Sequence, residues 1–277
     1  MFHTVSPSGT PLSCPVNGSP SPVGAASVGA VDLDIATVAD RPVDRAPLDG
    51  HWPPFMTNDP TSGLYYGYVD EHFPEFCLVA LDRATGRPVA KAYSVPLSFA
   101  GDIAAGLPDG GWDWAIRQSA HDRLSGAQPT IASALEILVH PELRGGGLSG
   151  VMLAAMRDNA RRLGFADLVA PVRPSGKHLE PHRPIDEYAF ATRPDGLPVD
   201  PWLRVHVRAG GRIVNVAHHS MVVPARPERW REWTGLPFDT TGPVEVPFAL
   251  SPVHCDIDQD VAVYVEPNVW VHHRTGA

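Results

Sequence analysis

Three consecutive glycines, Gly145 to Gly147, lie in the stretch of this sequence best suited to chemistry. The apolar run Ala134–Val139 before them predicts a strand, and the residues from Leu148 to Leu163 predict an amphipathic helix. The first turn of a helix leaves several backbone N–H groups without partners, and their dipoles favour an anion. Glycines let a large anion approach that backbone closely. The segment therefore predicts a binding site for a polyanion such as a pyrophosphate.

Two common phosphate-binding loops fit the glycines poorly. The P-loop requires a lysine directly after its last glycine, but the only two lysines of the chain are Lys91 and Lys177. The dinucleotide fingerprint Gly-x-Gly-x-x-Gly matches Gly145–Gly150 loosely, and Asp167 lies near the required distance. However, Asp167 precedes the apolar run Leu168–Val172 instead of ending it, and no βαβαβ series follows. Neither class of loop is favoured.

The loop resembles that of a third class, the Gcn5-related N-acetyltransferase (GNAT) superfamily. Its pyrophosphate loop reads Arg/Gln-x-x-Gly-x-Gly/Ala, and Arg144-Gly-Gly-Gly-Leu-Ser149 departs from it only at Ser149. The lead-in from His140 to Arg144 is also typical of that superfamily. Later stretches resemble an actinobacterial GNAT branch that also occurs fused to carbon–nitrogen hydrolases: Asp195–His206, Gly210–Ile213, Ser220–Met221, Trp230–Gly235 and Tyr264–Trp270. The resemblance covers roughly residues 31 to 273.

This resemblance implies an acyl-CoA co-substrate, such as acetyl-CoA, and a small-molecule amine as acceptor. The backbone amides of Gly145, Gly146, Gly147, Leu148 and Ser149 would hold the pyrophosphate, and Arg144 would add positive charge. The backbone of Leu138 and Val139 would pair with the pantetheine amides. In this superfamily two adjacent strands splay apart, and the gap between Leu138 and about Pro171 would admit the pantetheine arm.

Three residues are candidates for acid–base catalysis. Glu136 occupies the strand position where the superfamily often places a base that acts through water. His206 stands where the usual acid is a tyrosine, four residues before Gly210. Tyr188 is a substitute acid from the Pro- and His-rich insert between residues 173 and 197. Two of the three also have a structural interpretation: a solvent-facing or salt-bridged carboxylate for Glu136, and a packed helix histidine for His206.

The acceptor pocket is expected to come from variable segments of the chain. We assign to it two aromatic residues and three insert residues: Trp112, Trp114, Lys177, His178 and Arg183. No metal is expected. The adjacent pairs at residues 218–219 and 272–273 diverge on a strand, and His178-x3-His182 has no further ligand nearby.

The pattern along the chain predicts the elements that position these residues. Strands are expected at 31–38, 76–82, 88–96, 134–139 and 168–172, then at 212–216 and 220–223, with short late strands at 244–247, 252–255, 261–265 and 269–272. Helices are expected at 58–72, from 110 onward, at 148–163 and at 202–209. This order matches an α/β (α+β) GNAT fold: a mixed, mostly antiparallel, twisted sheet with helices on both faces and an extra C-terminal β region.

Three parts follow from these boundaries. Residues 1–30 are rich in Pro, Ser and Gly and predict a flexible tail. Residues 31–223 form the acyltransferase domain, and residues 224–277 form a C-terminal β extension packed on it. The net charge of −9 argues against nucleic-acid binding. The sequence contains no apolar run long enough for a membrane span, and its three scattered cysteines suggest reduced thiols, so a cytoplasmic location is expected.

The leading hypothesis is therefore an acyl-CoA-dependent N-acyltransferase that acts on a small amine by direct attack, possibly in specialised metabolism. In a second hypothesis the acyl donor is the phosphopantetheine thioester of an acyl carrier protein. The phosphopantetheine would then be bound by Arg144, Arg173 and Lys177. A third is a non-catalytic CoA-binding module. The identity of the amine, the acyl chain and a possible homodimer formed through the C-terminal region stay open.

Overall fold

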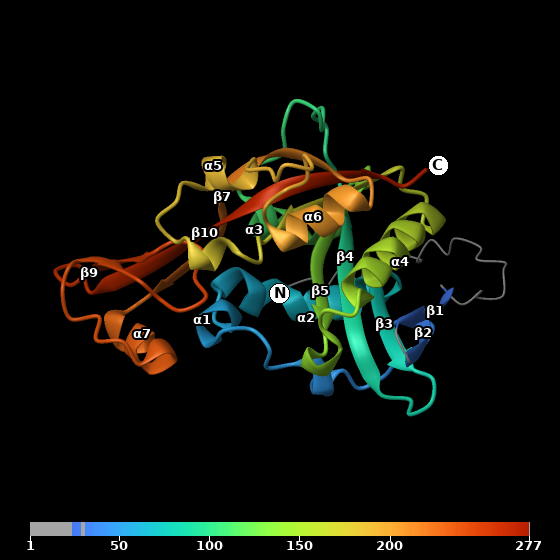
Figure 1. The fold of residues 1–277 in the computed structure, drawn as a ribbon, viewed down its shortest axis with the longest axis horizontal. Coiled ribbons are helices and arrows are strands. Elements are labelled where there is room, and N and C mark those ends of the chain that lie inside the picture. Colours follow the sequence, from blue (N-terminus) through green and yellow to red (C-terminus); the bar gives the residue numbers. More distant parts are fainter. Residues whose placement is uncertain (1–23, 29–30, 277) are drawn as a thin grey trace, which may run out of the picture.

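The computed structural model describes residues 24–28 and 31–276. In this part of the chain ten strands form one sheet in the order β1-β2-β3-β4-β5-β6-β10-β9-β8, with β7 paired to β10 (Figure 1). The first six strands are β1 (Gly24–Val28), β2 (Val31–Thr37), β3 (Cys77–Asp82), β4 (Pro88–Leu97), β5 (Ile131–Val139) and β6 (Asp167–Val172). The others are β7 (Arg212–Ala225), β8 (Gly242–Val244), β9 (Val253–Asp256) and β10 (Val261–Arg274).

One strand pair of this sheet is parallel, that of β5 with β6, and its connection runs through helix α4 (Leu148–Arg162). The remaining pairs of the described sheet are antiparallel. A parallel pair requires a long crossover, which α4 supplies, while hairpins and returning strands build the rest. The prediction of a mixed, mostly antiparallel sheet is confirmed.

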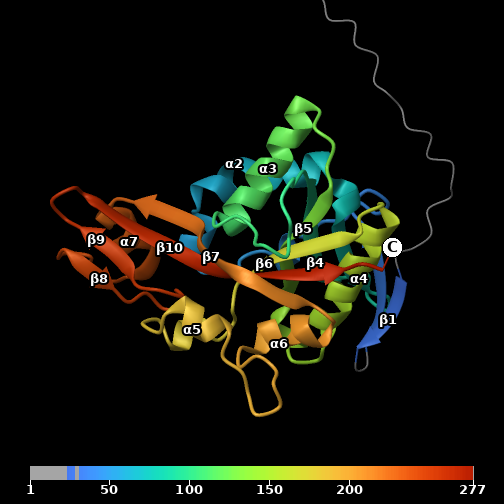
Figure 2. The same ribbon diagram turned by 90° about the horizontal axis from the view of Figure 1, so that it is seen from above.

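Helices cover both faces of the sheet (Figure 2). On one face α4 and α6 (Pro201–Arg208) bury residues such as Met152 and Leu203 in one apolar cluster. On the other face a second cluster contains side chains from α1 (Pro54–Thr57), α2 (Pro60–His72), α3 (Gly111–Ser125) and α7 (Pro227–Thr234). The short α5 (Ile185–Ala189) lies in the insert after β6. The sheet is thus the middle layer, with its two faces available to different elements.

Two of the predicted helices, at 58–72 and 202–209, begin at Asp-Pro pairs. The Asp59 side chain accepts a hydrogen bond from the Ser62 amide, and the Asp200 side chain accepts from the amides of Trp202 and Leu203. In each helix the proline stands at the first helical position, where its missing N–H costs nothing. Helix α4 ends just before Gly164, whose φ of 93° is left-handed, as expected for a glycine past a helix end.

The termini of the chain differ from the prediction. Gly24–Val28 falls in the predicted flexible tail but forms β1, paired with β2, whereas residues 1–23 lie outside the described residues. Two pairs of predicted short strands are each one long strand, β7 and β10, and α7 was not predicted. The residues predicted as a C-terminal β extension packed on the domain are part of the same sheet, in which β10 pairs with β6 on one side and with β7 and β9 on the other. The predicted boundary at residue 223 falls within β7.

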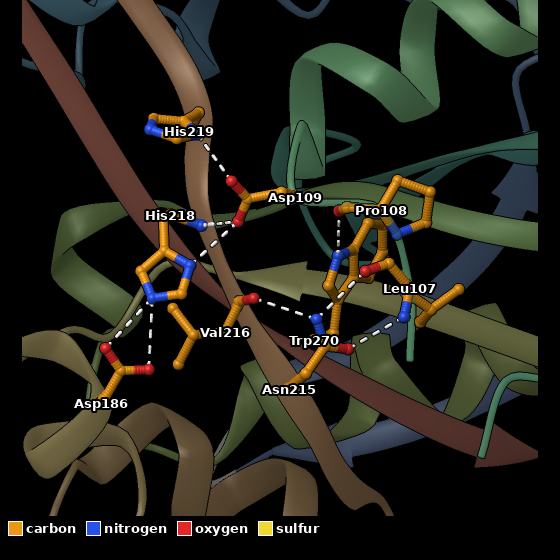
Figure 3. A network of polar contacts seen from close by, with 9 residues as sticks. All are labelled: Leu107, Pro108, Asp109, Asp186, Asn215, Val216, His218, His219 and Trp270. Carbon is orange, nitrogen blue, oxygen red and sulfur yellow. Dashed lines mark hydrogen bonds and ion pairs between the residues drawn. The ribbon is translucent and has the colours of Figure 1, made fainter. Parts of the chain in front are cut away.

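A polar network fastens the loop before α3 to β7 and α5 (Figure 3). The His218 ring bonds Asp109 at 3.0 Å and Asp186 at 3.0 Å, and His219 lies 2.6 Å from Asp109. Leu107 lies in the same loop before α3. The Asn215 side chain of β7 accepts a hydrogen bond from the Leu107 N–H and donates one to the Leu107 C=O. These contacts hold three segments, far apart in the sequence, against one another.

We expect His218 to titrate above the usual histidine range. The hydrogen bond to Asp186 raises its pKa most, and burial opposes this shift. Because the folded pKa is raised, the contact stabilises the fold at low pH and is lost as the pH rises through that value. The effect on stability is small because the ring is 47% exposed.

Two-dimensional NMR of labelled histidine rings tests this expectation. The Asp186→Asn variant should lower the pKa of His218 toward ordinary histidine, about 6.5. The exposed Asp258→Asn variant should leave the titration unchanged. An ordinary pKa in the parent protein would show that the ion pair does not form in solution.

Candidate functional site

The parallel strands β5 and β6 separate soon after they meet. In the described structure they pair at Ala132↔Leu168 and Ser133↔Val169 and nowhere beyond. From Ala134 to Val139, β5 therefore leaves one backbone edge without a strand partner, while its other edge stays paired with β4. Unpaired strand edges offer N–H and C=O groups to an extended ligand. The predicted splay of these two strands is present.

Alternation along β5 decides which residues face the open edge. The His140 amide donates to Val89 of β4 at 2.9 Å. In an antiparallel ladder, residues two apart point their backbone groups to the same side, so Leu138 also faces β4. Ile137 and Val139 then face the open edge, and the Val139 carbonyl accepts a contact from Arg144 Nε at 3.3 Å. The open edge is thus formed by Val139, as expected, and by Ile137 instead of Leu138.

The glycine loop opens directly into α4, close to this edge. Gly145 and Gly147 have φ values of 81° and 90°, and a Cβ added at either would meet no atom within 4 Å. Glycine is favoured there because other residues rarely adopt these angles. Gly147 caps α4 without a side-chain hydrogen bond. Among the described residues, no partner accepts a hydrogen bond from the amides of Gly145 through Ser149. The loop is therefore exposed and unpaired at the positive end of a 15-residue helix.

Glu136 is held in a cluster on the α2 face of the sheet. Its carboxylate accepts a hydrogen bond from Trp52 Nε1 at 2.7 Å and another from the Tyr66 hydroxyl. Lys91 Nζ lies 3.3 Å from the same carboxylate and 3.4 Å from Asp49. Burial, followed by the charge of Glu136, raises the pKa of Tyr66 well above its usual range, so the phenol stays a donor. Glu136 is 9% exposed and is a paired carboxylate.

A register shift in β5 places Leu135 beside this cluster, and Leu135 in turn contacts Trp112, one of the predicted pocket residues. Tyr93 and Ser94 of β4 are consecutive, but their partners Glu136 and Ala134 are two apart, so Leu135 is an extra residue. Leu135 therefore packs in the same cluster as Tyr66 instead of pointing to the opposite face, as simple alternation predicted. Its carbonyl accepts from Trp112 Nε1 at 2.9 Å. Trp114 lies apart from Trp112, against Phe99 and Trp270.

His206 has properties unlike those of a general acid. The ring is 2% exposed and its Nδ1 lies 2.9 Å from Nε2 of His273. Burial lowers the pKa of His206 to about 3, so the ring is neutral at physiological pH and has no proton to give as an imidazolium. His273 also pairs with Leu168, at the end where β5 and β6 are joined. These features favour the packed-histidine interpretation.

The insert residues form a cluster of their own. Lys177 Nζ donates to the carbonyls of Glu180, Pro181 and Leu250, which occupies its three N–H donors. The Tyr188 hydroxyl donates to Asp200 at 3.1 Å and the side chain is 3% exposed. The remaining two pocket candidates are also engaged locally, Arg183 above the Tyr188 ring and His178 against Phe248. In the described structure, the hydrogen bonds and ring contacts of this cluster do not reach Glu136 or the glycine loop.

Sequence reasoning missed the partners of Glu136. One signal was available, since Lys91 is a lysine between Ala90 and Ala92 in an apolar strand, and a lysine buried there requires an anion. Nothing in the sequence pointed to Trp52 or Tyr66. Among the described residues no group of three His, Cys, Asp or Glu side chains is placed to hold a metal ion. The helices described include none with the length and apolarity needed to cross a membrane.

Comparisons with known proteins agree with this geometry. No family model matches the chain. An arginine N-acetyltransferase of Aspergillus versicolor is 34% identical over 253 residues, which are 82% of this chain and 86% of that protein. The crystal structure of the loading GNAT-like domain of CurA from Lyngbya majuscula has a TM-score of 0.54 at 16% identity, covering 88% of this chain and 98% of that one. A Sinorhizobium meliloti phosphinothricin acetyltransferase with acetyl-CoA is more distant: 12% identity, TM-score 0.40, 89% of each chain.

The chain therefore belongs to the GNAT superfamily. It is an acyltransferase that moves an acyl group from a CoA thioester to an amine. The prediction of a non-catalytic module is not retained.

Proposed function

We propose that this enzyme N-acetylates arginine, or a closely related amine with a second cationic group, with acetyl-CoA as the acyl donor. The relative that suggests this acceptor aligns over most of both chains. The observation that supports acetyl-CoA as the acyl donor is the unpaired edge of β5 beside the unpaired amides of the glycine loop.

In the proposed donor complex, the amides of Gly145 through Ser149 bind the pyrophosphate, and Arg144 adds its charge from the exposed side of the loop. The pantetheine then runs along Ile137 and Val139, where backbone groups face the unpaired edge. An amide on that edge polarises the thioester carbonyl and stabilises the tetrahedral oxyanion.

The acyl transfer itself forms a C–N bond and breaks the C–S bond. The amine must lose a proton to attack, and the departing thiolate must gain one. We assign the proton removal to Glu136, which acts through water, because it is the one ionisable side chain of β5, the strand with the open edge. Lys91 and Tyr66 act as positioning residues that hold this carboxylate.

The test is a mass-spectrometric assay with acetyl-CoA and a panel of amines that includes L-arginine, together with detection of released thiol. We expect a single acetylation of arginine and one equivalent of CoA. An acyl carrier protein loaded with the same acyl group should serve poorly as donor. Faster transfer from the carrier, with no turnover of free acetyl-CoA, would contradict the proposed donor and favour the carrier-protein hypothesis.

A further inference from the structure

Helix α3 packs against α2 and β10, and each of these three elements carries a buried carboxylate. Asp59 is the N-cap of α2, Asp113 lies in the first turn of α3, and Glu266 lies in β10. Their exposed fractions are 1%, 5% and 0%. Burial raises the pKa of both Asp59 and Asp113, the charge of Glu266 adds to the shift of Asp59, and the charge of Asp59 adds to that of Asp113. Asp59 is thus within electrostatic range of both other acids.

The cations of the chain neutralise one of these three acids. Glu266 accepts from Arg173 Nε at 2.9 Å and from the Tyr264 hydroxyl at 2.8 Å. By contrast, Oδ1 of Asp59 and Oδ1 of Asp113 are buried and accept no hydrogen bond from the described residues. The nearest other cation, Arg117, is exposed and directs its Nε to the Asp113 carbonyl at 3.0 Å. Two carboxylates therefore lack a direct cationic partner.

An unpaired buried carboxylate is costly, so it binds either a proton or a cation. Burial, and then the charge of Asp59, raises the pKa of Asp113 to about 7, and burial also raises that of Asp59. Arg117 and a Thr61 hydrogen bond oppose the shift of Asp113 without cancelling it. Near neutral pH a cationic group that arrives here would replace a weakly held proton. The unpartnered oxygens thus indicate a ligand with positive charge.

The acid cluster is linked to the acyl-transfer strand through Trp112. This residue directly precedes Asp113, and its Nε1 donates to the Leu135 carbonyl in β5, next to Glu136. Its backbone amide donates to Ser220 Oγ at 2.8 Å. Ser220 in turn bonds Asn268, whose amide bonds Glu266. One polar network therefore extends from Glu266 to the strand on which we place the thioester.

We propose that Asp59 and Asp113 bind the cationic end of the acceptor, such as a guanidinium, while its amine is presented to the thioester beside β5. A guanidinium suits such a site because it is planar, always charged, and carries several N–H donors for carboxylate oxygens. This proposal rests on the proposed function and adds the residues that select the acceptor.

L-Citrulline is the matched probe, because it replaces the guanidinium of L-arginine with a neutral group of nearly the same shape. We expect kcat/KM for L-arginine to exceed that for L-citrulline by about 10- to 100-fold, the range for charge-assisted hydrogen bonds. In Asp113→Asn and in Asp59→Asn, this preference should fall to within a few-fold, because the larger loss falls on L-arginine. Asparagine also caps helices well, so Asp59→Asn should fold.

Two further measurements separate selection of the acceptor from a merely structural role. Asp113→Asn should keep or raise the Tm above pH 7, because it removes an unpaired buried charge. The control Asp122→Asn changes a buried α3 carboxylate that is fully engaged by Ser98 and Gln118, so it should lower the Tm and keep the arginine preference.

The outcomes distinguish this inference from the proposed function. Equal use of the two amino acids by the parent enzyme, or an unchanged preference in both variants, would overturn the inference and leave N-acetylation of arginine intact. If neither is acetylated, the proposed function fails. Calorimetric titration of L-arginine into the enzyme with CoA then decides the inference, which predicts heat for the parent enzyme and none for Asp113→Asn.

Discussion

Replacing Gly147 by glutamate is expected to weaken acetyl-CoA binding by at least about 100-fold, or roughly 2.7 kcal/mol. Two effects act together in this variant. The new carboxylate would stand in the open space where we place the pyrophosphate and repel it. The backbone at φ 90° would also shift toward values that a side chain tolerates, which moves the amides of Leu148 and Ser149. Calorimetric titration with acetyl-CoA measures the loss.

The control for this variant is Gly164→Glu at the other end of α4. Gly164 has a φ of 93° and a Cβ there would also meet nothing within 4 Å, so both variants carry the same backbone strain. We expect both to lose about 1–2 kcal/mol of stability, the usual cost of a left-handed residue with a side chain. Acetyl-CoA affinity should fall in Gly147→Glu alone. Equal acetyl-CoA affinities in the two variants would show that the loop is not part of the binding site.

Replacing Glu136 by glutamine should lower kcat by about 100-fold or more, the usual contribution of a positioned base. Glutamine keeps the size of the side chain and one of the two oxygens that accept from Trp52 and Tyr66, but it removes the negative charge beside Lys91, so the Tm should fall while the KM for acetyl-CoA changes little. Steady-state assays measure kcat and KM, and the Tm serves as a fold check.

The alanine variant separates chemistry from packing at this position. Glu136→Ala leaves Lys91, which is 6% exposed, without its closest anion, and this should cost about 3–5 kcal/mol of stability. Glu142→Gln, an exposed change shortly after β5, is the surface control and should alter neither quantity. A glutamine variant with parental kcat would show that Glu136 only anchors Lys91.

Much of the fold could be predicted because its signals are local. The Asp-Pro pairs at residues 59 and 200 mark helix starts through hydrogen bonds that span two or three residues. The strand, glycines and helix around Gly146 likewise lie within one continuous stretch. The long strands β7 and β10 were each divided in two, because polar residues and a proline interrupt their apolar pattern. In β10 the ladder with β7 has a register shift between Glu266 and Asn268, on either side of the proline.

The surroundings of the candidate site could not be predicted because they depend on distant contacts. Glu136 meets Trp52 across 84 residues and Tyr66 across 70. Lys177 and Tyr188 looked suited to a pocket by residue type, yet their polar atoms bond within the insert and its neighbours. Asp59 and Asp113 come near each other through the packing of α2 against α3, which no local pattern signals.

A crystal structure of the enzyme with bound CoA tests the central claim most directly. The account predicts the diphosphate on the amides around Gly146 and the pantetheine along the unpaired edge of β5, with its thiol pointing toward the Glu136 side of the sheet. CoA bound at another surface, with the loop amides solvated and the β5 edge unoccupied, would contradict it.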